Sequence, residues 1–188
     1  MYYIMTVYTI YFVIMTLSFR KIASIVKGTF YSRFRSLAVS DHVPPVSILV
    51  PSYNEELTII ESVRSLLSLE YPKYEVLVVN DGSVDRTLDV LIEEFGLTAL
   101  PDSELPESYA LEASPIRAVY HNPEYPNLYV LDKPNGGKAD ALNVGINFSH
   151  YPLICTIDAD SLLDRDALIR MVRVYMENPE ETVAVGGT

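Results

Sequence analysis

The chain has 188 residues, of which 49% are apolar, with a formal net charge of −11 and one cysteine, Cys155. A single cysteine excludes a disulfide framework and indicates a reduced thiol in the core. Residues 1–40 hold five basic residues and no Asp or Glu, which leaves nine basic and 25 acidic residues to the other 148. So acidic a body argues against nucleic acid as a partner, because phosphate contacts need clustered Lys and Arg.

Residues 1–19 contain no charged side chain, and about 20 apolar residues are enough for a helix to cross a bilayer. We predict a transmembrane helix over residues 1–19, followed by a basic juxtamembrane segment and linker over residues 20–45. The five basic residues all follow the apolar segment, so we expect the rest of the chain to lie in the cytoplasm and the N-terminus outside. Membrane lipid is therefore an expected partner. A signal-like or interfacial helix is the alternative. The basic residues are Arg20, Lys21, Lys27, Arg33 and Arg35.

From residue 46 onward, strand-like and helix-like stretches alternate. Strands are expected over residues 46–50, 74–79, 116–120, 128–131, 153–157 and 182–185. A first helix carries an apolar face of Leu57, Ile60, Val63, Leu66 and Leu67, and further helices are expected over residues 85–95, 138–148 and 164–178. Asn54 and Asp164 are the expected N-caps of the first and last helices, and residues 96–115 read as a surface excursion. This alternation predicts an α/β fold with a mostly parallel sheet and helices on both faces.

Four turns follow strands of this predicted sheet, at residues 51–55, 80–83, 136–138 and 158–160. Ligands of such sheets bind at the carboxyl ends of the strands. The four turns are therefore expected to meet at one edge and to form one site.

Asp158 and Asp160 follow a buried strand and lie two residues apart. Because strand side chains alternate in direction, both carboxylates are expected to point the same way. Two carboxylates held this close repel each other unless a cation lies between them, and Mg²⁺ or Mn²⁺ prefers such oxygen ligands. The alternative is that one Asp caps the next helix and the other is merely exposed.

The other three turns offer groups that suit a nucleoside diphosphate. Asp81 can accept hydrogen bonds from a base edge or ribose, Tyr53 offers a stacking face and Glu55 another acceptor. The N–H groups of the Gly-Gly turn at 136–137 open a helix and would favour phosphate, with Lys138 adding a positive charge. Each of these groups has a plainer alternative. Asp81 could bond its own backbone, residues 136–137 could be only a tight turn, and Lys138 could be only a solvated residue of the first helical turn.

Four motifs together resemble family 2 glycosyltransferases. They are Val-Ser-Ile-Leu-Val-Pro-Ser-Tyr-Asn-Glu-Glu (46–56), Val-Val-Asn-Asp-Gly-Ser-Val-Asp (78–85), Asn-Gly-Gly-Lys-Ala-Asp-Ala-Leu-Asn (135–143) and Ile-Asp-Ala-Asp-Ser (157–161). With the N-terminal apolar segment, they are most similar to membrane synthases of the cellulose, hyaluronan and poly-N-acetylglucosamine type. The resemblance covers residues 46–188.

The resemblance implies a GT-A fold and inverting transfer of a sugar from a nucleotide sugar, usually a UDP-sugar, to a polysaccharide or glycan acceptor, with Mg²⁺ or Mn²⁺. Carried over by position, it implies that Lys138 binds the diphosphate, while Asp158 and Asp160 bind the ribose, diphosphate and metal. The nucleotide-sugar site would further include Pro51, Tyr53, Glu55 and Asp81.

The family's general base lies in a Thr-Glu-Asp or similar motif, and neither this motif nor the family's later Gln-x-x-Arg-Trp motif occurs in these 188 residues. No catalytic residue is therefore assigned. The chain is expected to be the N-terminal, donor-binding part of a C-terminally truncated synthase, with little transferase activity alone. A non-catalytic nucleotide-sugar-binding module is the alternative. A nucleotidyltransferase would need an Arg- and Gly-rich first loop, which residues 51–55 do not supply.

Overall fold

The computed structural model describes residues 5–8, 10–16, 43–101 and 110–186. The chain divides into two units, Met1–Leu37 and Ala38–Thr188. In the first unit, residues 5–8 and 10–16 are helical. No helix within the described ranges is long and apolar enough to cross a membrane. Residues 1–4, 9 and 17–19 of the predicted transmembrane helix lie outside those ranges, as do residues 20–42 of the predicted juxtamembrane segment and linker.

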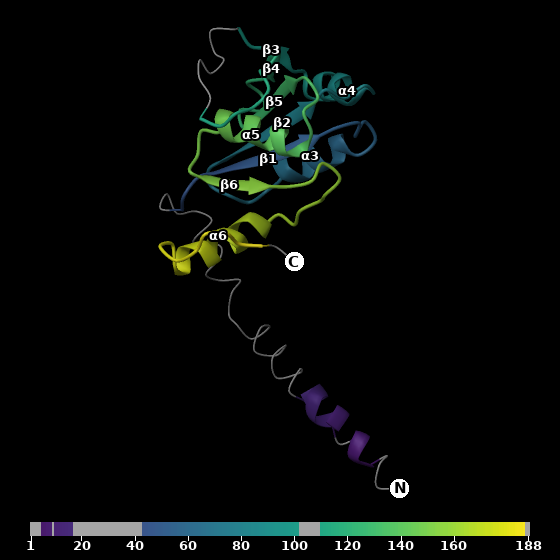
Figure 1. Ribbon diagram of the computed structural model, residues 1–188, viewed down its shortest axis with the longest axis vertical. Helices are drawn as coiled ribbons and strands as arrows, with labels where there is room; N and C mark the ends of the chain where they lie inside the picture. The colour runs from purple at the N-terminus through teal and green to yellow at the C-terminus, as the bar shows by residue number, and fades with distance from the viewer. Residues whose placement is uncertain (1–4, 9, 17–42, 102–109, 187–188) are drawn as a thin grey trace. The chain divides into compact units, whose positions relative to one another are not determined.

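The second unit is built on a six-stranded sheet in the order β3-β4-β5-β2-β1-β6 (Figure 1). Four neighbouring strands, β5, β2, β1 and β6, run parallel, while β4 pairs antiparallel with β5 and β3 pairs antiparallel with β4. The predicted mostly parallel α/β sheet is therefore confirmed. The strands are β1 (Val46–Ser52), β2 (Tyr74–Asp81), β3 (Thr98–Ala99), β4 (Ala118–His121), β5 (Leu128–Lys133) and β6 (Leu153–Thr156).

Helices cover both faces of the sheet. Strand side chains alternate between the two faces, so apolar side chains lie on both and each face has to be buried. Leu49, Leu77 and Leu131 of three strands form one buried cluster with Ala141 and Val144 of α5 (Lys138–Phe148). The intervening strand residues point to the opposite face, where α3 (Ile59–Leu67) contacts β2 and packs beside α4 (Thr87–Phe95). The last helix, α6 (Ala167–Glu177), lies beside the edge strand β6 (Figure 1).

The start of the first helix differs from the prediction. α3 begins at Ile59 with Thr58 as its N-cap residue, and Asn54 instead adopts a left-handed backbone with φ 58°. Leu57, which was expected on the apolar face, is 90% exposed. The physical reason is that the chain before Thr58 is held as a loop by hydrogen bonds to the turn after β2, so helical spacing starts later than the apolar pattern suggests.

Three further predictions need correction near the edges of the sheet. The N-cap of α6 is Asp166, because residues 164–167 form a separate turn closed by a hydrogen bond from the Ala167 N–H to the Asp164 carbonyl. Residues 182–185 form no strand; they follow a turn at residues 178–182 and line a groove along β6 and α6. The expected surface excursion contains β3, which extends the sheet beyond β4.

Candidate functional site

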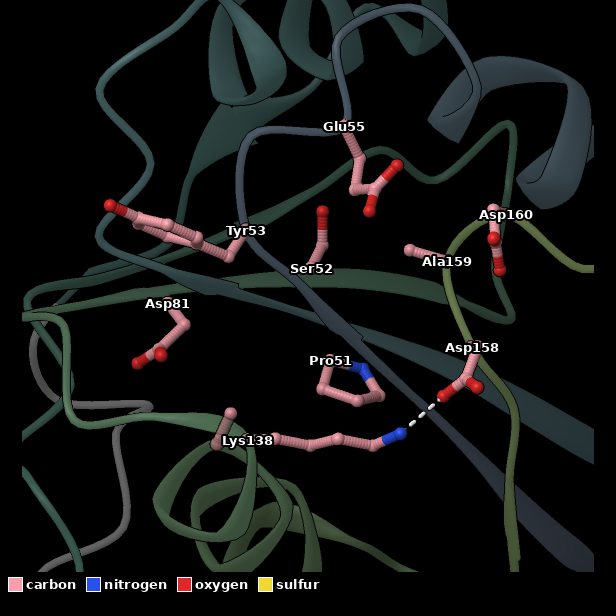
Figure 2. A pocket seen from close by; sticks show the side chains of 10 residues that line it. Pro51, Ser52, Tyr53, Glu55, Asp81, Lys138, Asp158, Ala159 and Asp160 are labelled. Atoms are coloured by element: carbon pink, nitrogen blue, oxygen red, sulfur yellow. Dashed lines mark hydrogen bonds and ion pairs between the residues drawn. The ribbon is translucent and has the colours of Figure 1, made fainter.

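One cavity of about 310 Å³ opens at the carboxyl ends of the parallel strands. It lies where the strand order reverses, because β1 has β2 on one side and β6 on the other, and such switch points are where open α/β sheets bind ligands. All seven predicted site residues line this cavity (Figure 2): Pro51, Tyr53, Glu55, Asp81, Lys138, Asp158 and Asp160. The expected convergence of the four turns is therefore confirmed, while the role of each residue toward a ligand stays a prediction.

The first turn is held in place by the second. The Asn54 N–H donates to Ser83 Oγ at 3.0 Å, and the Val84 N–H donates back to Asn54 Oδ1 at 2.9 Å. The Glu55 N–H also donates to Thr87 Oγ1, at 2.8 Å. These reciprocal bonds fix the loop that carries Tyr53 and Glu55 into the cavity, and they account for the left-handed backbone at Asn54.

The Glu55 carboxylate is a partly buried wall of the cavity and has a local partner. Its Oε2 accepts a hydrogen bond from Thr58 Oγ1 at 2.7 Å, which leaves its other oxygen available to a ligand. Tyr53 is 48% exposed. It lines the cavity, and its role as a stacking face for a ligand stays a prediction.

Asp81 is buried and tied to the third turn. Its Oδ1 accepts from Lys133 Nζ and, at 2.9 Å, from the Gly136 N–H, while Oδ2 accepts from the Gly137 N–H at 2.8 Å. The Asn135 side chain also donates to the Asp81 carbonyl, at 2.9 Å. Asp81 thus bonds another turn, which excludes the plainer alternative in which it bonds its own backbone.

This arrangement corrects the expected role of the Gly-Gly turn. The N–H groups of Gly136 and Gly137 were expected to be free for phosphate, yet both point at the Asp81 carboxylate. The reason is electrostatic: a carboxylate placed at a helix start satisfies the same unpaired N–H groups that would attract phosphate. Lys138 is then the cationic group of this turn that faces the cavity.

Lys138 extends across the cavity toward the fourth turn (Figure 2). Its ammonium lies 2.5 Å from Asp158 Oδ1, and the two side chains are 62% and 63% exposed. Because Ile157 and Ala159 are buried while Asp158 and Asp160 are exposed, the alternation predicted for the strand end persists through both carboxylates. Asp158 and Asp160 therefore stand on the same wall of the cavity.

Asp158 and Asp160 fit a metal that arrives with phosphate ligands. Mg²⁺ usually takes one or two protein carboxylates together with substrate phosphates, and this wall supplies two. No cluster of three or more His, Cys, Asp or Glu suited to a metal occurs among the described residues, so a cage made of protein ligands alone is not seen there.

Sequence reasoning missed Ser52, Ala141 and Ala159, which also line the cavity. Ser52 is nearly fully buried, and within the described part of the chain its Oγ has no hydrogen-bond partner. Figure 2 shows its side chain pointing into the space beside Tyr53 and Glu55. Burying a hydroxyl without a partner is unfavourable. The sequence signal that could have identified Ser52 as a site residue is its position between Pro51 and Tyr53, which were both predicted to line the site.

Lys133 was missed as well, although it contacts Asp81 directly. It stands at the end of β5 and its side chain is 0% exposed. A lysine directly before the Pro-Asn-Gly-Gly turn reads as a solvated strand end, so only the position of Asp81 across the sheet reveals its partner.

Comparison with known proteins now gives the family. Residues 47–97 and 112–188 match the family model described as Glycosyl transferase family 2. The chain belongs to this family. The match includes all four turns that line the cavity.

Relatives within this glycosyltransferase family are longer than the chain. The poly-beta-1,6-N-acetyl-D-glucosamine synthase of Staphylococcus epidermidis is 33% identical over 155 residues, which cover 81% of this chain and 31% of the relative. A probable glycosyltransferase of Bacillus subtilis, YdaM, is 30% identical over 148 residues, which cover 77% of this chain and 29% of that protein. The chain thus spans about a third of the length of these relatives.

Solved glycosyltransferase structures share the fold. The mannosyltransferase PcManGT from Pyrobaculum calidifontis, in complex with GDP-Man and Mn²⁺, superposes with a TM-score of 0.55 at 23% identity, over 78% of this chain and 39% of its own. S. aureus TarS 1–349 in complex with UDP-GlcNAc gives a TM-score of 0.52 at 24% identity, over 72% of this chain and 32% of its own. At these identities the likeness concerns the fold alone, which is the one that the resemblance implied.

Proposed function

We propose that this chain binds a nucleotide sugar, in particular a UDP-sugar, as the donor-binding part of an inverting glycosyltransferase that acts on a polysaccharide or glycan acceptor. One observation carries the proposal. Seven residues from four separate turns, predicted as a donor site, line one cavity at the switch point of the sheet. Family membership supports the same reaction class.

Asp81 favours uracil as the base. A carboxylate offers about four acceptor positions, and Lys133 with the two glycine N–H groups takes three of them. As far as the described residues show, one acceptor on Oδ2 remains, which suits the single ring N–H of uracil better than the two adjacent donors of guanine. The Tyr53 ring supplies a stacking face, and the Ser52 hydroxyl, which has no hydrogen-bond partner among the described residues, supplies a further polar contact.

Charge at the other end of the cavity favours a diphosphate with a divalent cation. Lys138 would contact the phosphates, and Asp158 and Asp160 would hold Mg²⁺ or Mn²⁺. The metal, when bound with the donor, would neutralise the diphosphate and stabilise it as a leaving group. Because Lys138 is paired with Asp158 in this structure, phosphate would compete for its ammonium and free that carboxylate.

The sugar we propose is N-acetylglucosamine. The support is the similarity to the poly-beta-1,6-N-acetyl-D-glucosamine synthase of Staphylococcus epidermidis. We further propose that the chain acts at the cell membrane, with residues 1–19 as a single N-terminal pass and the donor-binding domain in the cytoplasm. The uncharged first 19 residues and the basic residues that follow support this topology.

Calorimetric titration of the full chain in detergent tests the proposal. UDP is titrated with and without Mn²⁺, with GDP as the matched control, and donor hydrolysis is then assayed with UDP-N-acetylglucosamine and UDP-glucose. We expect UDP to bind more tightly than GDP, and Mn²⁺ to strengthen UDP binding.

Each outcome has a defined meaning. Absence of UDP binding at millimolar concentration, with or without Mn²⁺, would refute the proposal, and equal binding of GDP would refute the base assignment. Hydrolysis of either donor above the rate in buffer would exclude the alternative, a non-catalytic nucleotide-sugar-binding module.

A further inference from the structure

Lys133 is a fully buried cation beside the proposed donor site. Its side chain is 0% exposed, and its ammonium contacts Asp81 Oδ1, Asp140 Oδ2 at 2.6 Å and the Pro134 carbonyl at 2.6 Å. Burying an ammonium is costly unless oxygen ligands replace the lost water. Here three oxygens do so, and two of them belong to carboxylates.

Asp140 lies in the first turn of α5 and completes this group. Burial raises the pKa of its carboxyl, but hydrogen bonds from Lys133 and Ser114 outweigh burial and lower the pKa below its usual value. Its Oδ1 accepts from the Ser114 N–H at 2.8 Å. A Cβ added at Gly136 would lie 2.3 Å from Asp140 Oδ2, so the carboxylate packs directly under the turn that holds Asp81.

We propose that Lys133 and Asp140 are positioning residues of the donor site: Lys133, held by Asp140, fixes the Asp81 carboxylate against the Gly136-Gly137 turn. This inference rests on the proposed function, in which Asp81 contacts the nucleoside. Lys133 itself is buried under the turn and lies outside the residues that line the cavity. It acts on the ligand only through Asp81.

The arrangement of one cation between two carboxylates predicts how substitutions combine. Removing the ammonium alone leaves Asp81 and Asp140 facing each other without a counter-ion, so repulsion would displace Asp81. Removing the Asp140 charge as well leaves Asp81 with its two backbone donors and no opposing carboxylate. The second substitution should therefore restore part of the ligand affinity that the first one removes. If the two substitutions were independent structural defects, their losses of affinity would add.

The test compares wild type, K133M, D140N and K133M/D140N in the full chain, with uridine and UDP titrated calorimetrically and folding followed by thermal unfolding. K133M should weaken uridine and UDP by the same factor, about tenfold or more, as expected for loss of a charge-assisted hydrogen bond. D140N keeps the Lys133–Asp81 pair, so its affinity for uridine and UDP should fall much less than that of K133M. K133M/D140N should bind more tightly than K133M. K73M is the matched control, because Lys73 is exposed and precedes β2 at the opposite edge of the sheet.

The outcomes separate this inference from the proposed function. If wild type binds neither uridine nor UDP, the proposed function fails. If wild type binds but K133M matches it, or K133M/D140N binds no better than K133M, the positioning role is refuted. If K133M does not fold, K133M/D140N takes its place, and the inference requires that this double variant fold and bind uridine within about tenfold of wild type; failure of either refutes it.

Discussion

At the scale of single residues, Asp81 has two tasks at once. It closes the start of α5 by accepting from the Gly136 and Gly137 N–H groups, and it keeps one acceptor direction open beside the cavity. The cost of burying its charge is offset by Lys133 and these donors. The base end of the proposed donor site is therefore assembled before ligand arrives, which lowers the cost of ordering on binding.

Lys138 should act on the phosphates alone. We expect K138A to weaken UDP about tenfold or more, as for loss of one charge-assisted contact, and to leave uridine within a factor of about two. The reason is that its ammonium faces Asp158, at the far side of the cavity from Asp81 (Figure 2). Calorimetric titration with both ligands measures this, with K73A as control. Equal losses for uridine and UDP would contradict the phosphate role.

Asp160 should carry the metal dependence of donor binding. In D160A we expect Mn²⁺ to lose most of its effect on UDP affinity, because only one of the two carboxylates of the fourth turn, Asp158, would remain to hold the metal. UDP affinity is measured over a Mn²⁺ titration. D164A is the matched control, since Asp164 is an exposed aspartate that pairs with Arg170 outside the cavity. Unchanged Mn²⁺ dependence in D160A would remove this residue from the metal site.

The sequence predicted the cavity-lining residues better than their partners. Asp158 and Asp160 follow from strand alternation alone, and Asp81 and Lys138 follow from turns at strand ends. What the sequence could not supply was pairing across the sheet: Lys133 lies 52 positions from Asp81, and only the parallel register of β2 and β5 places them together. For the same reason the Gly-Gly turn was misread, because its partner is remote in sequence.

At the scale of elements, α5 connects the core to the site. Its bounds, Lys138–Phe148, are those predicted from sequence, and one face packs on β1 and β2 while its first turn carries Lys138 and Asp140. Gly145 allows this approach, because an added Cβ would lie 3.0 Å from Leu49 Cδ2 in the buried core. The position of the site thus depends on close packing about two helical turns away.

G145V should destabilise the fold. The extra atoms would overpack a fully buried contact with Leu49, and overpacking typically costs about 1–3 kcal/mol. The midpoint of urea unfolding measures the loss. G186V is the control, because a Cβ at Gly186 would meet no atom within 4 Å. An unchanged midpoint in G145V would show that β1 and α5 can separate without penalty.

The type of most elements was predictable here, whereas several element ends were not. The central parallel strands follow from short apolar runs, because both of their faces are buried. The helices follow from apolar residues at helical spacing, because each buries one face. These ends depend on tertiary hydrogen bonds. The Asn54 N–H donates to Ser83 Oγ in the turn after β2, so the chain around Asn54 stays a loop and α3 begins only at Ile59. Likewise residues 182–185 have an apolar strand-like pattern but lie along β6 and α6 without joining the sheet.

At the scale of the whole molecule, acidity is compensated locally. The net charge of −11 would oppose an anionic ligand, yet two of the four acidic side chains that line the cavity have a cationic partner, Lys133 for Asp81 and Lys138 for Asp158. Several carboxylates outside the cavity are likewise held in their charged form by hydrogen bonds. The stability of the fold should therefore depend on acid pH.

We expect the free energy of unfolding to fall as pH drops below about 4, the usual range of aspartate pKa values. Burial raises the pKa of Asp85, but hydrogen bonds from Thr87 and nearby backbone outweigh it and lower the pKa; in Asp166 the hydrogen bond from Arg170 lowers it. Groups with a lowered folded pKa stabilise above the unfolded value and lose that contribution as pH falls through the folded one.

Urea unfolding between pH 7 and pH 2 measures this dependence, with D85N as the comparison. D85N removes one titrating carboxylate, so its stability should change less steeply below about pH 4 than that of wild type. A wild-type stability that stays constant down to pH 2 would contradict the proposed contribution of these carboxylates.

The basic residues that follow the apolar N-terminal segment predict its orientation at a membrane. Residues 1–19 are uncharged and the next 21 carry five basic and no acidic residues, so the positive-inside tendency places the flank after the apolar segment in the cytoplasm. A reporter active only in the cytoplasm, fused after Ser40, should give a signal, and the same reporter fused before Met1 should give none. The opposite pattern would overturn the topology, and signal from both fusions would refute the single pass. Replacing the five basic residues with Gln should weaken the preference, because their charge, rather than the apolar length, sets the orientation.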